Sequence, residues 1–535
     1  MRIKKNTMKK IILILTLSCI IHFAYAQSFN GFALYNAQGS NTTYLIDENQ
    51  SIAHEWVMNT ECNYTVALKE NGNLVRGTKT STSIFSNGNI AASGGRVQEI
   101  APDGSVVWDY TYVSNEYVSH HDLTLIGDNV LLTAYEKKSA NELNDAGYDN
   151  ANSEKWPTHF IELEPDGNGS ANIVWEWHIW DHMCQDMDPT KPNYVANVSD
   201  HPELIDINMI QSQGGGPGGG GGDWFHVNGV GYNADLDQIV FSSRFASEIY
   251  IIDHSTTTGE AATNSGGNSD MGGDILYRWG NPSNYGFSNY PQVISSAVHD
   301  SRWIIDDGRP NGGFLQIFNN SGGGNNQSTI DGIETPWDPA NNIYTRQVGQ
   351  PFEPTSYSTR YECEHSASGQ SASDRMSNGN IFVNASGGQG GAGLMYEVDA
   401  VTEQIIWGPY PADSQKGFRY ECDYPGVLAL ESYMNTATTS CFDPSSIENA
   451  YEKDILIYPN PTSSFIIIDL EEISSPLIKV EIRNSIGQEV YIQELNNSNN
   501  SVYTIRLEDY PEGIYFINLI LDNGKVTTNL VSFYR

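Results

Sequence analysis

Short runs of alternating apolar and polar residues recur along most of the chain, separated by turns rich in Asn, Gly and Asp. Two clear units read YTVALKENGNLVRG from position 64 and HDLTLIGDNVLLTAY from position 121, and each continues into an acidic turn and a Trp. Similar units begin at positions 226, 299, 365 and 424. Units of a few short strands, too small to bury a core alone, are typical of β-propeller blades. The pattern predicts an all-β fold whose main part is a six-bladed β-propeller.

Histidine opens four of these units, at His121, His226, His299 and His365, and Tyr424 opens the last one. The first strand of each propeller blade lines the central channel, so residues at the starts of these strands converge at one end of it. We therefore expect the four imidazoles to surround one axial site. The alternative is that each histidine is an ordinary polar residue at the end of a strand.

The first 26 residues have the pattern of a secretory signal peptide. Basic residues precede the apolar run 11–21, and Ala24-Tyr25-Ala26 supplies small residues at the cleavage position. The mature chain is expected to begin near Gln27 and the propeller to cover residues 27–445. The strands predicted between 27 and about 60 are expected to help close the ring.

The composition changes at about position 446. Residues 446–535 contain no His or Cys and carry alternating runs such as SSFIIIDL and YTIRLEDY, bounded by turn residues. Strands at this spacing predict a small antiparallel β-sandwich.

The longest interval between two units contains a predicted insertion, roughly residues 136–222, which ends in the tract GGGPGGGGG. Such a glycine tract is typical of a flexible loop, and its position just before His226 would let it pass over the mouth of the channel. His178, His182 and Asp186 have a spacing that on a helix would place them on one side and mimic a metal site. Pro189 and the Trp-rich flanks favour a packed loop instead, and no metal is expected.

The net charge is −37, and removing residues 1–26 makes it −42, because five basic and no acidic residues are lost. A surface this acidic argues against nucleic acid and against anionic membranes as partners. Beyond the signal peptide no stretch approaches the length of a transmembrane segment. An anionic substrate would need positive groups placed locally, and the axial His and Arg residues are candidates for that role.

Five cysteines remain in the mature chain, in an export context that permits disulfides. Three of them occupy similar places, in TECNY, YECEH and YECDY. Because the first and last blades of a ring are neighbours, a bridge between Cys62 and Cys422 is one expectation, and a local bridge between Cys422 and Cys441 is the other. The odd number leaves one thiol free.

The residues around His226 indicate more than a strand end. They read DWFHVN at 223–228, and in an extended strand the side chains of His226 and Asn228 point to the same face. Arg244 ends the next run and would return to that place with a permanent positive charge and a forked set of donors.

Six segments resemble the arylsulfotransferases that work without a nucleotide sulfate donor. They are HHDLTLI at 120–126, WEWHIWDH at 175–182, DWFHVN at 223–228, FSSRFASEIYIIDHS at 241–255, GGDILYRWGNP at 272–282 and VHDSRWI at 298–304. The resemblance implies a six-bladed propeller in which a central histidine carries the sulfuryl group transiently. By motif this nucleophile is His299, and the sulfate-binding groups are His121, His226, Asn228 and Arg244. The periplasmic branch carries an N-terminal β domain that supports dimers, and only about 35 residues precede the first blade here, so dimerisation is not carried over.

The chemistry of sulfuryl transfer fits these residue types. A neutral imidazole is a nucleophile near neutral pH and forms a labile intermediate. The charge that spreads over the sulfuryl oxygens in the transition state requires preplaced donors such as His, Asn and Arg. A second histidine, His121 or His226, would protonate the leaving phenolate and deprotonate the acceptor phenol. No cofactor is expected, and Tyr424 and Trp residues at the channel mouth are candidates for stacking on the aryl rings.

The tail resembles the C-terminal sorting domain of the type IX secretion system. The carrying motifs are YPNP at 458–461, NSIGQ at 484–488 and YPEGIY at 510–515. The resemblance implies the type IX machinery as a partner and a secreted or outer cell-surface location.

Two other functions are compatible with a propeller with axial histidines. Four histidines on separate blades also describe the iron site of carotenoid-cleaving oxygenases, although an Arg aimed at the site disfavours a divalent metal. A secreted propeller that binds glycan or protein without catalysis is the third hypothesis. His365 has no role that the arylsulfotransferase motifs assign, and the neighbouring Glu362 and Glu364 would repel a sulfate if they faced the channel.

Overall fold

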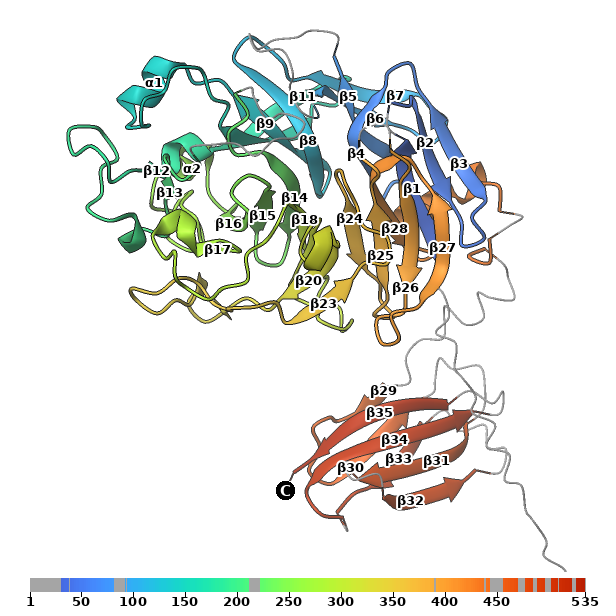
Figure 1. The fold of residues 1–535 in the computed structure, drawn as a ribbon. Coiled ribbons are helices and arrows are strands. Elements are labelled where there is room, and N and C mark those ends of the chain that lie inside the picture. Colours follow the sequence, from blue (N-terminus) through green and yellow to red (C-terminus); the bar gives the residue numbers. More distant parts are fainter. Residues whose placement is uncertain are drawn as a thin grey trace, which may run out of the picture. The chain divides into compact units, whose positions relative to one another are not determined.

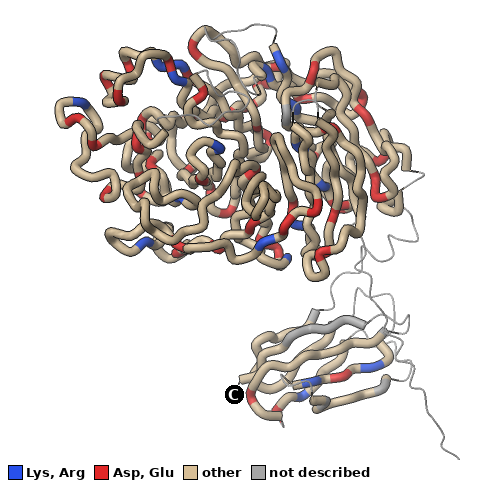
Figure 2. Tube along the Cα trace, in the orientation of Figure 1, with Lys and Arg blue, Asp and Glu red and all other residues tan. Residues whose placement is uncertain are grey.

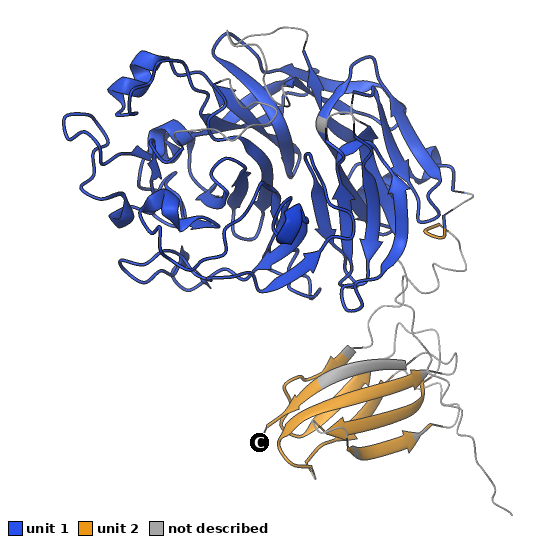
Figure 3. Cartoon of the chain, viewed as in Figure 1, with its two compact units in different colours: residues 1–439 blue, residues 440–535 orange. Residues whose placement is uncertain are grey.

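The computed structural model describes residues 30–534, apart from 38, 81–91, 93, 211–221, 389–390, 437–438, 443–455, 470–476, 485–487, 496–501, 509 and 522–525. The chain divides into two compact units, residues 1–439 and residues 440–535 (Figure 3). The expected signal peptide and the glycine tract of the insertion lie outside the described residues.

The described part of unit 1 contains six four-stranded antiparallel sheets, the number of blades that the sequence predicts. Three sheets come from the N-terminal half, and the first of them takes one strand from the end of the unit. The sheet that closes the ring contains β28 (Ser414–Glu421), β1 (Gly31–Ala37), β2 (Thr42–Ile46) and β3 (Ile52–Val57). The next two contain β4 (Cys62–Leu68), β5 (Leu74–Lys79), β6 (Gly95–Ile100) and β7 (Val106–Thr111), and β8 (Tyr117–Ile126), β9 (Asn129–Glu136), β10 (Thr158–Pro165) and β11 (Ala171–His178).

The other three sheets follow in chain order. They contain β14 (Val227–Asn233), β15 (Gln238–Ser243), β16 (Glu248–Asp253) and β17 (Tyr277–Trp279); β18 (Val298–Trp303), β19 (Leu315–Asn319), β20 (Thr329–Ile333) and β23 (Thr359–Glu362); and β24 (Ala372–Arg375), β25 (Ile381–Ala385), β26 (Leu394–Val398) and β27 (Ile405–Pro411). Helices are short, with α1 (Ala140–Asp145), α2 (Thr258–Ala261) and α3 (Pro425–Leu430) in the connections.

The sheets of unit 1 stand around a ring (Figure 1). One edge strand of each sheet faces the centre, and these inner strands contact one another in the cyclic order β4, β8, β14, β18, β24, β28 and back to β4. The ring closes where β28 pairs with β1, with Phe32 opposite Tyr420. The expectation that the first strands after position 27 take part in ring closure is therefore confirmed.

Two of the predicted unit starts are displaced. The inner strands β4, β14 and β18 begin within two residues of positions 64, 226 and 299, and β8 begins at Tyr117 and contains His121. The fifth begins at Ala372 rather than His365, and the sixth begins at Ser414 and has ended before Tyr424, which instead precedes α3. Tyr424 donates a hydrogen bond from its hydroxyl to the carbonyl oxygen of Leu68.

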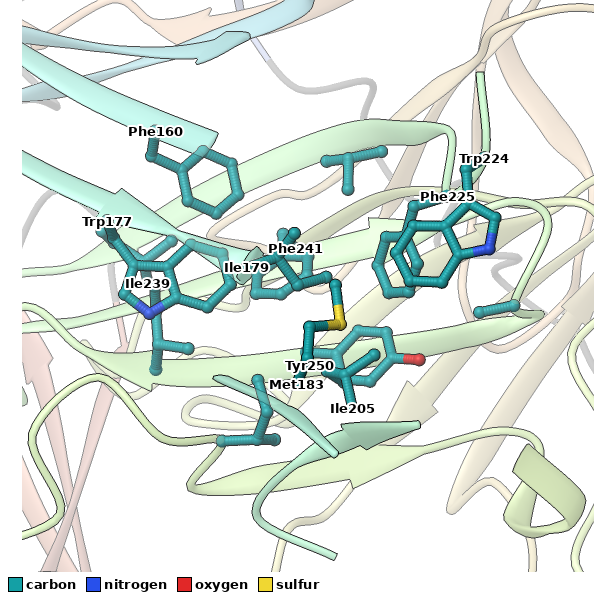
Figure 4. Packing of buried hydrophobic residues seen from close by; sticks show 14 of the residues in the cluster. Phe160, Trp177, Ile179, Met183, Ile205, Trp224, Phe225, Ile239, Phe241 and Tyr250 are labelled. Carbon is teal, nitrogen blue, oxygen red and sulfur yellow. The ribbon is translucent and has the colours of Figure 1, made fainter. Parts of the chain in front are cut away.

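Alternation along the strands buries large apolar residues between neighbouring sheets. One cluster packs aromatic rings of the β8 sheet against rings of the β14 sheet, including Phe160, Trp177, Phe241 and Tyr250 (Figure 4). The ring centroids of Phe160 and Phe241 are 5.2 Å apart, in an edge arrangement that suits the aromatic quadrupole.

The stretch 136–222 is not one continuous insertion. Two strands within it, β10 and β11, complete the β8 sheet, and the extra segments lie before and after them. The first extra segment contains α1, which begins with a capping box between Ser139 and Glu142. The second contains the short parallel pair β12 (Met183–Cys184) and β13 (Ile205–Asp206). A further two-stranded antiparallel sheet, β21 (Trp337–Asp338) and β22 (Ile343–Tyr344), lies elsewhere in unit 1.

Unit 2 has two antiparallel sheets that pack face to face. One contains β29 (Leu456–Tyr458), β30 (Phe465–Asp469) and β33 (Val502–Arg506); the other contains β32 (Glu489–Glu494), β31 (Leu477–Asn484), β34 (Gly513–Leu521) and β35 (Val526–Phe533). Ile466 and Ile505 of the first sheet share a buried cluster with Val480 and Ile517 of the second. The small antiparallel sandwich predicted from the sequence is confirmed.

Cys422 and Cys441 are disulfide-bonded, whereas Cys62, Cys184 and Cys363 are free and buried. The expected alternative of a bridge between Cys62 and Cys422 is therefore wrong, and three described thiols are free rather than one.

Acidic side chains are spread along the trace of unit 1 (Figure 2). Within the described residues, no helix is long and apolar enough to cross a membrane.

Candidate active site

A cavity of about 190 Å³ lies where the inner strands begin. Its lining includes His121, His226, Arg244 and His299, so four of the five predicted site residues come together. The ring centroids of His121 and His226 are 4.6 Å apart. Gln370, Gln415 and Asn320 are among the other polar residues of the lining, and the sequence patterns did not single them out.

Irregular backbone turns these side chains toward the axis. The register shifts between Ser119 and Leu123 in β8, between Val227 and Gly229 in β14, and between His299 and Arg302 in β18. A β-bulge bends a strand and re-aims a side chain, which explains how successive blades present a histidine in the same way.

Two of the histidines also have a left-handed backbone, with φ of 51° at His121 and 54° at His226. This conformation is uncommon for residues other than glycine and is held only when the surrounding structure enforces it. The clustering of such positions at one cavity marks it as a candidate functional site.

His299 has one defined tautomer. Its Nδ1 lies 2.7 Å from the carbonyl oxygen of Ala297 and must donate a proton to it, which leaves Nε2 with a lone pair. Burial is the main cause that lowers the pKa of His299 well below its usual value, and the positive charge of Arg244 acts in the same direction. The imidazole is therefore neutral at physiological pH and nucleophilic at Nε2.

His226 is held by a carboxylate. Its Nδ1 lies 2.5 Å from Oδ2 of the fully buried Asp223. Oδ1 of Asp223 has no hydrogen-bond partner in the described part of the chain. A carboxylate on Nδ1 fixes the orientation of the ring, which is the arrangement of an acid–base histidine.

His121 is paired with another histidine. The Nδ1 atoms of His120 and His121 are 2.7 Å apart, so one of them donates a proton to the other. His120 stacks on Tyr135 with ring centroids 3.5 Å apart, and burial lowers the pKa of both histidines well below its usual value. The HH dipeptide is the sequence signal that could have identified His120.

Arg244 brings positive charge to the cavity. Its backbone N–H donates to the carbonyl oxygen of His226 at 3.1 Å, and its guanidinium carbon is 5.5 Å from the centre of the Phe245 ring. Among the residues that the structure describes, no carboxylate lies within ion-pair distance of this half-buried guanidinium. Its charge is thus available to an anionic ligand.

Asn228 does not reach the cavity lining. Its side chain is fully buried, Nδ2 donates to the carbonyl oxygen of Val298 at 2.9 Å, and Oδ1 accepts from the hydroxyl of Ser242 at 2.7 Å. The bulge after Val227 breaks the alternation that would have put His226 and Asn228 on one face. Asn228 ties the strand of His226 to the strand of His299.

The fourth predicted histidine is elsewhere. His365 does not line the cavity, and its half-buried ring packs edge-on against Tyr396 with centroids 5.5 Å apart. Glu362 and Glu364, beside it, are exposed. The expectation that four imidazoles meet at one site is therefore wrong, and three of them do.

The insertion histidines do not share a helix. His178 ends β11 and lies between Glu136 and Glu176, whereas the buried His182 is bound to Asp274 and to the carbonyl oxygen of Ala261. His182 is the last residue of a short 3-10 helix, Ile179–His182, that follows β11. Within the described residues no group of three or more His, Cys, Asp or Glu is arranged to hold a metal ion.

A buried ionic hub follows the cavity histidines along the inner strands. Nζ of Lys416, on β28, is 2.5 Å from Oδ2 of Asp122 and 3.4 Å from Oδ1 of Asp300. These two aspartates directly follow His121 and His299, and all three hub residues are almost completely buried. One cation thus fixes the strands of two cavity histidines.

The hub also reaches the remaining inner strands. Asp122 accepts hydrogen bonds from the Thr65 hydroxyl of β4 and the Val230 N–H of β14, and Asp300 accepts one from the Ser373 N–H of β24. Groups from all six inner strands therefore meet at the hub. No local pattern points to Lys416, because its partners lie 116 and 294 positions away along the chain.

Two protein-family models match parts of the chain. Residues 7–260 match the family model described as Arylsulfotransferase (ASST), and residues 456–532 match the model described as Secretion system C-terminal sorting domain. Both resemblances drawn from the sequence motifs are confirmed over these residues. The first match includes His121, His226 and Arg244 and supports a sulfotransferase-type function; it ends before His299. The second match points to export by the secretion machinery to the cell surface.

Individual relatives are distant. The chain is 32% identical to an ulvan lyase of Nonlabens ulvanivorans over 81 residues, which are 15% of this chain and 14% of that protein. A periplasmic gluconolactonase of Pseudomonas aeruginosa aligns over 89% of this chain and 99% of its own, with 10% identity and a TM-score of 0.35. A hydrazine synthase of Kuenenia stuttgartiensis aligns over 55% of this chain and 66% of its own, with 12% identity and a TM-score of 0.31.

Proposed function

We propose that unit 1 moves a sulfuryl group from an aryl sulfate to a phenol through a transient sulfohistidine on His299, without a nucleotide donor or a cofactor. The observation that carries this proposal is the hydrogen bond from Nδ1 of His299 to the Ala297 carbonyl, at 2.7 Å. It leaves Nε2 unprotonated in a cavity that also contains Arg244. An unprotonated nitrogen beside a fixed positive charge is what attack on a sulfate ester requires.

In the first half-reaction, Nε2 of His299 attacks the sulfur, the bond between sulfur and the aryl oxygen breaks, and a phenol leaves. In the second, the oxygen of an acceptor phenol attacks the sulfur, the S–N bond breaks, and His299 is regenerated. The charge on the sulfuryl oxygens faces Arg244 in both steps. His121, within the same lining, would provide a further hydrogen bond.

His226 is the better of the two candidates for proton transfer. Oδ2 of Asp223 accepts a hydrogen bond from Nδ1–H of His226, with the two atoms 2.5 Å apart, so Nε2 is left to give a proton to the leaving phenolate and later to take one from the acceptor. His121 is bound to the neutral His120 instead of a carboxylate, which does not favour a protonated form.

The other two hypotheses receive less support. An iron site with four axial histidines needs a fourth imidazole, but His365 packs against Tyr396 outside this lining, and Arg244 would repel a divalent cation. A propeller that only binds glycan or protein has no need for a buried nucleophile with a fixed tautomer.

Steady-state kinetics test the proposal. With a chromogenic aryl sulfate as donor, release of the chromophore should depend on an added phenol, and double-reciprocal plots at several acceptor concentrations should be parallel, as a covalent intermediate demands. Absence of acceptor-dependent turnover across several donors and acceptors would rule out the proposed reaction.

Unit 2 is proposed to direct the chain through the type IX secretion system to the exterior or the cell surface, after removal of the signal peptide. Deleting residues 446–535 should leave unit 1 in the periplasm. Export of the shortened chain at the normal level would contradict this role.

A further inference from the structure

The opposite end of the same channel contains a larger cavity, of about 540 Å³. Residues that follow the hub along each inner strand line it, among them Leu68, Leu123, Val230, Arg302 and Phe418. Since the earlier residues of these strands line the histidine cavity, the two cavities lie at opposite ends of the channel with the ionic hub between them. A volume of this size is in the range of small-molecule sites.

Four arginines contact this larger cavity, and three have carboxylate partners. Arg302 is paired with Asp300 and Asp374, Arg309 with Asp307, and Arg419 with Glu397. The carboxylates in the lining belong to Asp374, Glu421 and Asp423. Asp374 is paired with Arg302, and Oε1 of Glu421 lies 3.8 Å from Nη2 of Arg309. Asp423 is exposed to solvent.

Arg375 is different from the other three. Only 8% of this residue is exposed, yet no carboxylate of the described residues is within ion-pair distance of it. Its Nη1 donates to the carbonyl oxygen of Gly379, and its buried Nε has no hydrogen-bond partner within the described part of the chain. Burial lowers its pKa to about 10, so it is still charged at neutral pH. A buried cation without a counterion is costly unless a ligand supplies one.

We propose that this end of the channel binds an organic monoanion with a flat apolar body, such as an aromatic carboxylate or sulfonate, and that Arg375 is its charge partner. The anionic group would take the donors of Arg375 that protein groups leave unused. The apolar body would lie against Phe418, Leu123 and Val230, which line the same cavity. This site is separate from sulfuryl transfer and does not depend on the proposed reaction.

The hub explains why one ligand cannot occupy both sites. Asp122, Asp300 and Lys416 are almost fully buried and lie along the inner strands between the residues that line the two cavities. We therefore expect a ligand of Arg375 to enter the channel at the end that contains the larger cavity.

Calorimetric titration of the full-length protein with naphthalene-2-sulfonate tests the proposal, because the carbon–sulfur bond of this probe cannot be transferred. The background is Arg244→Gln, which weakens binding of the probe at the histidine cavity. We expect the Arg244→Gln protein to bind the probe at one saturable site. The further substitution Arg375→Gln should weaken this binding at least about tenfold, and the neutral probe naphthalene-2-sulfonamide should bind at least about tenfold more weakly than the sulfonate. Arg309→Gln, which removes a paired arginine of the same lining, should change affinity less than about threefold.

Arg375→Lys keeps the charge and should retain more affinity than Arg375→Gln, while unchanged thermal unfolding shows that each variant is folded. The proposal is overturned if the folded Arg244→Gln protein binds no probe. It is also overturned if its binding is insensitive to Arg375→Gln or equal for the sulfonate and the sulfonamide.

Discussion

The two ends of the channel in unit 1 are built from the same six strands but present different chemistry. At the end where the strands begin, bulged backbone presents three histidines and one arginine to a cavity of about 190 Å³. At the other end, arginines and apolar residues surround about 540 Å³ without a histidine in the described lining. The comparison teaches that the start of an inner strand, where bulges re-aim side chains, can carry a nucleophile, whereas its regular continuation provides a binding surface.

The largest expected effect is a difference in activity between substitutions of His299 and His365, two histidines that occupy equivalent places in the sequence pattern. His299→Ala should lower acceptor-dependent sulfuryl transfer by on the order of 1000-fold or more, because the nucleophile is lost. His365→Ala is the matched control, since His365 lies outside the cavity, and it should change the rate less than about twofold. A similar loss in both variants, measured by chromophore release, would contradict the assignment.

The hub between the two ends should matter for stability. Lys416→Met leaves Asp122 buried without a cation and removes one of the two cations beside Asp300, which keeps Arg302, and we expect a loss of about 3–5 kcal/mol in the free energy of unfolding. All eleven Trp residues precede position 440, so their fluorescence during denaturant unfolding reports on unit 1.

The control for the hub is Lys137→Met. Lys137 is partly exposed and lies 3.6 Å from the exposed Glu116, so its loss should cost about 0–1 kcal/mol. Equal losses for the two lysine variants would show that the hub contributes no more than a surface ion pair.

Substitutions of the arginines at the two ends should change kcat/KM by very different amounts. Arg244→Gln removes the positive charge beside His299 and is expected to lower kcat/KM for the aryl sulfate by about 100- to 1000-fold, the usual effect of losing one donor to a developing anion. Arg244→Lys should fall between this variant and the wild type. Arg375→Gln, at the far end, should leave kcat/KM within about twofold; a loss as large as that of Arg244→Gln would mean that the ends do not act separately.

The smallest expected effect concerns pH. Burial lowers the pKa of His299 well below 6.5, so the imidazole stays neutral as the pH falls through that value. An ordinary histidine would be half protonated at pH 6.5. Lowering the pH from about 7.5 to 6.5 should therefore slow the burst of phenol release less than about twofold. A stopped-flow burst rate that halves with an apparent pKa of 6.5 or above would contradict a neutral, buried nucleophile.

The repeated pattern predicts the sheets, the ring closure and the two-unit organisation, because alternation is a local property that each strand carries by itself. It misplaces the unit that contains His365, since YECEH resembles TECNY in letters, although Thr359–Glu362 is the outer strand β23 and Cys62 begins the inner strand β4. Similar short motifs at opposite edges of a sheet cannot be told apart without the pairing of the strands.

The site is predicted in part for a related reason. His121, His226, Arg244 and His299 follow from register and motif, but Asn228 points elsewhere, because a bulge after Val227 breaks the alternation from which its direction was predicted. Lys416 and its aspartates form one group only after the ring closes. Contacts that depend on closure leave no trace in local spacing.

The most direct measurement is the mass of the histidine-bearing peptides after rapid quenching. The protein is mixed with an aryl sulfate in the absence of acceptor, quenched in alkali, digested and analysed by mass spectrometry, with His299→Ala in parallel. The account predicts that the peptide containing His299 gains the mass of one SO₃ group, that the gain disappears when phenol is added before the quench, and that the variant shows none. A sulfuryl group found on another residue, or turnover in which no peptide of the wild-type protein is modified, would contradict it.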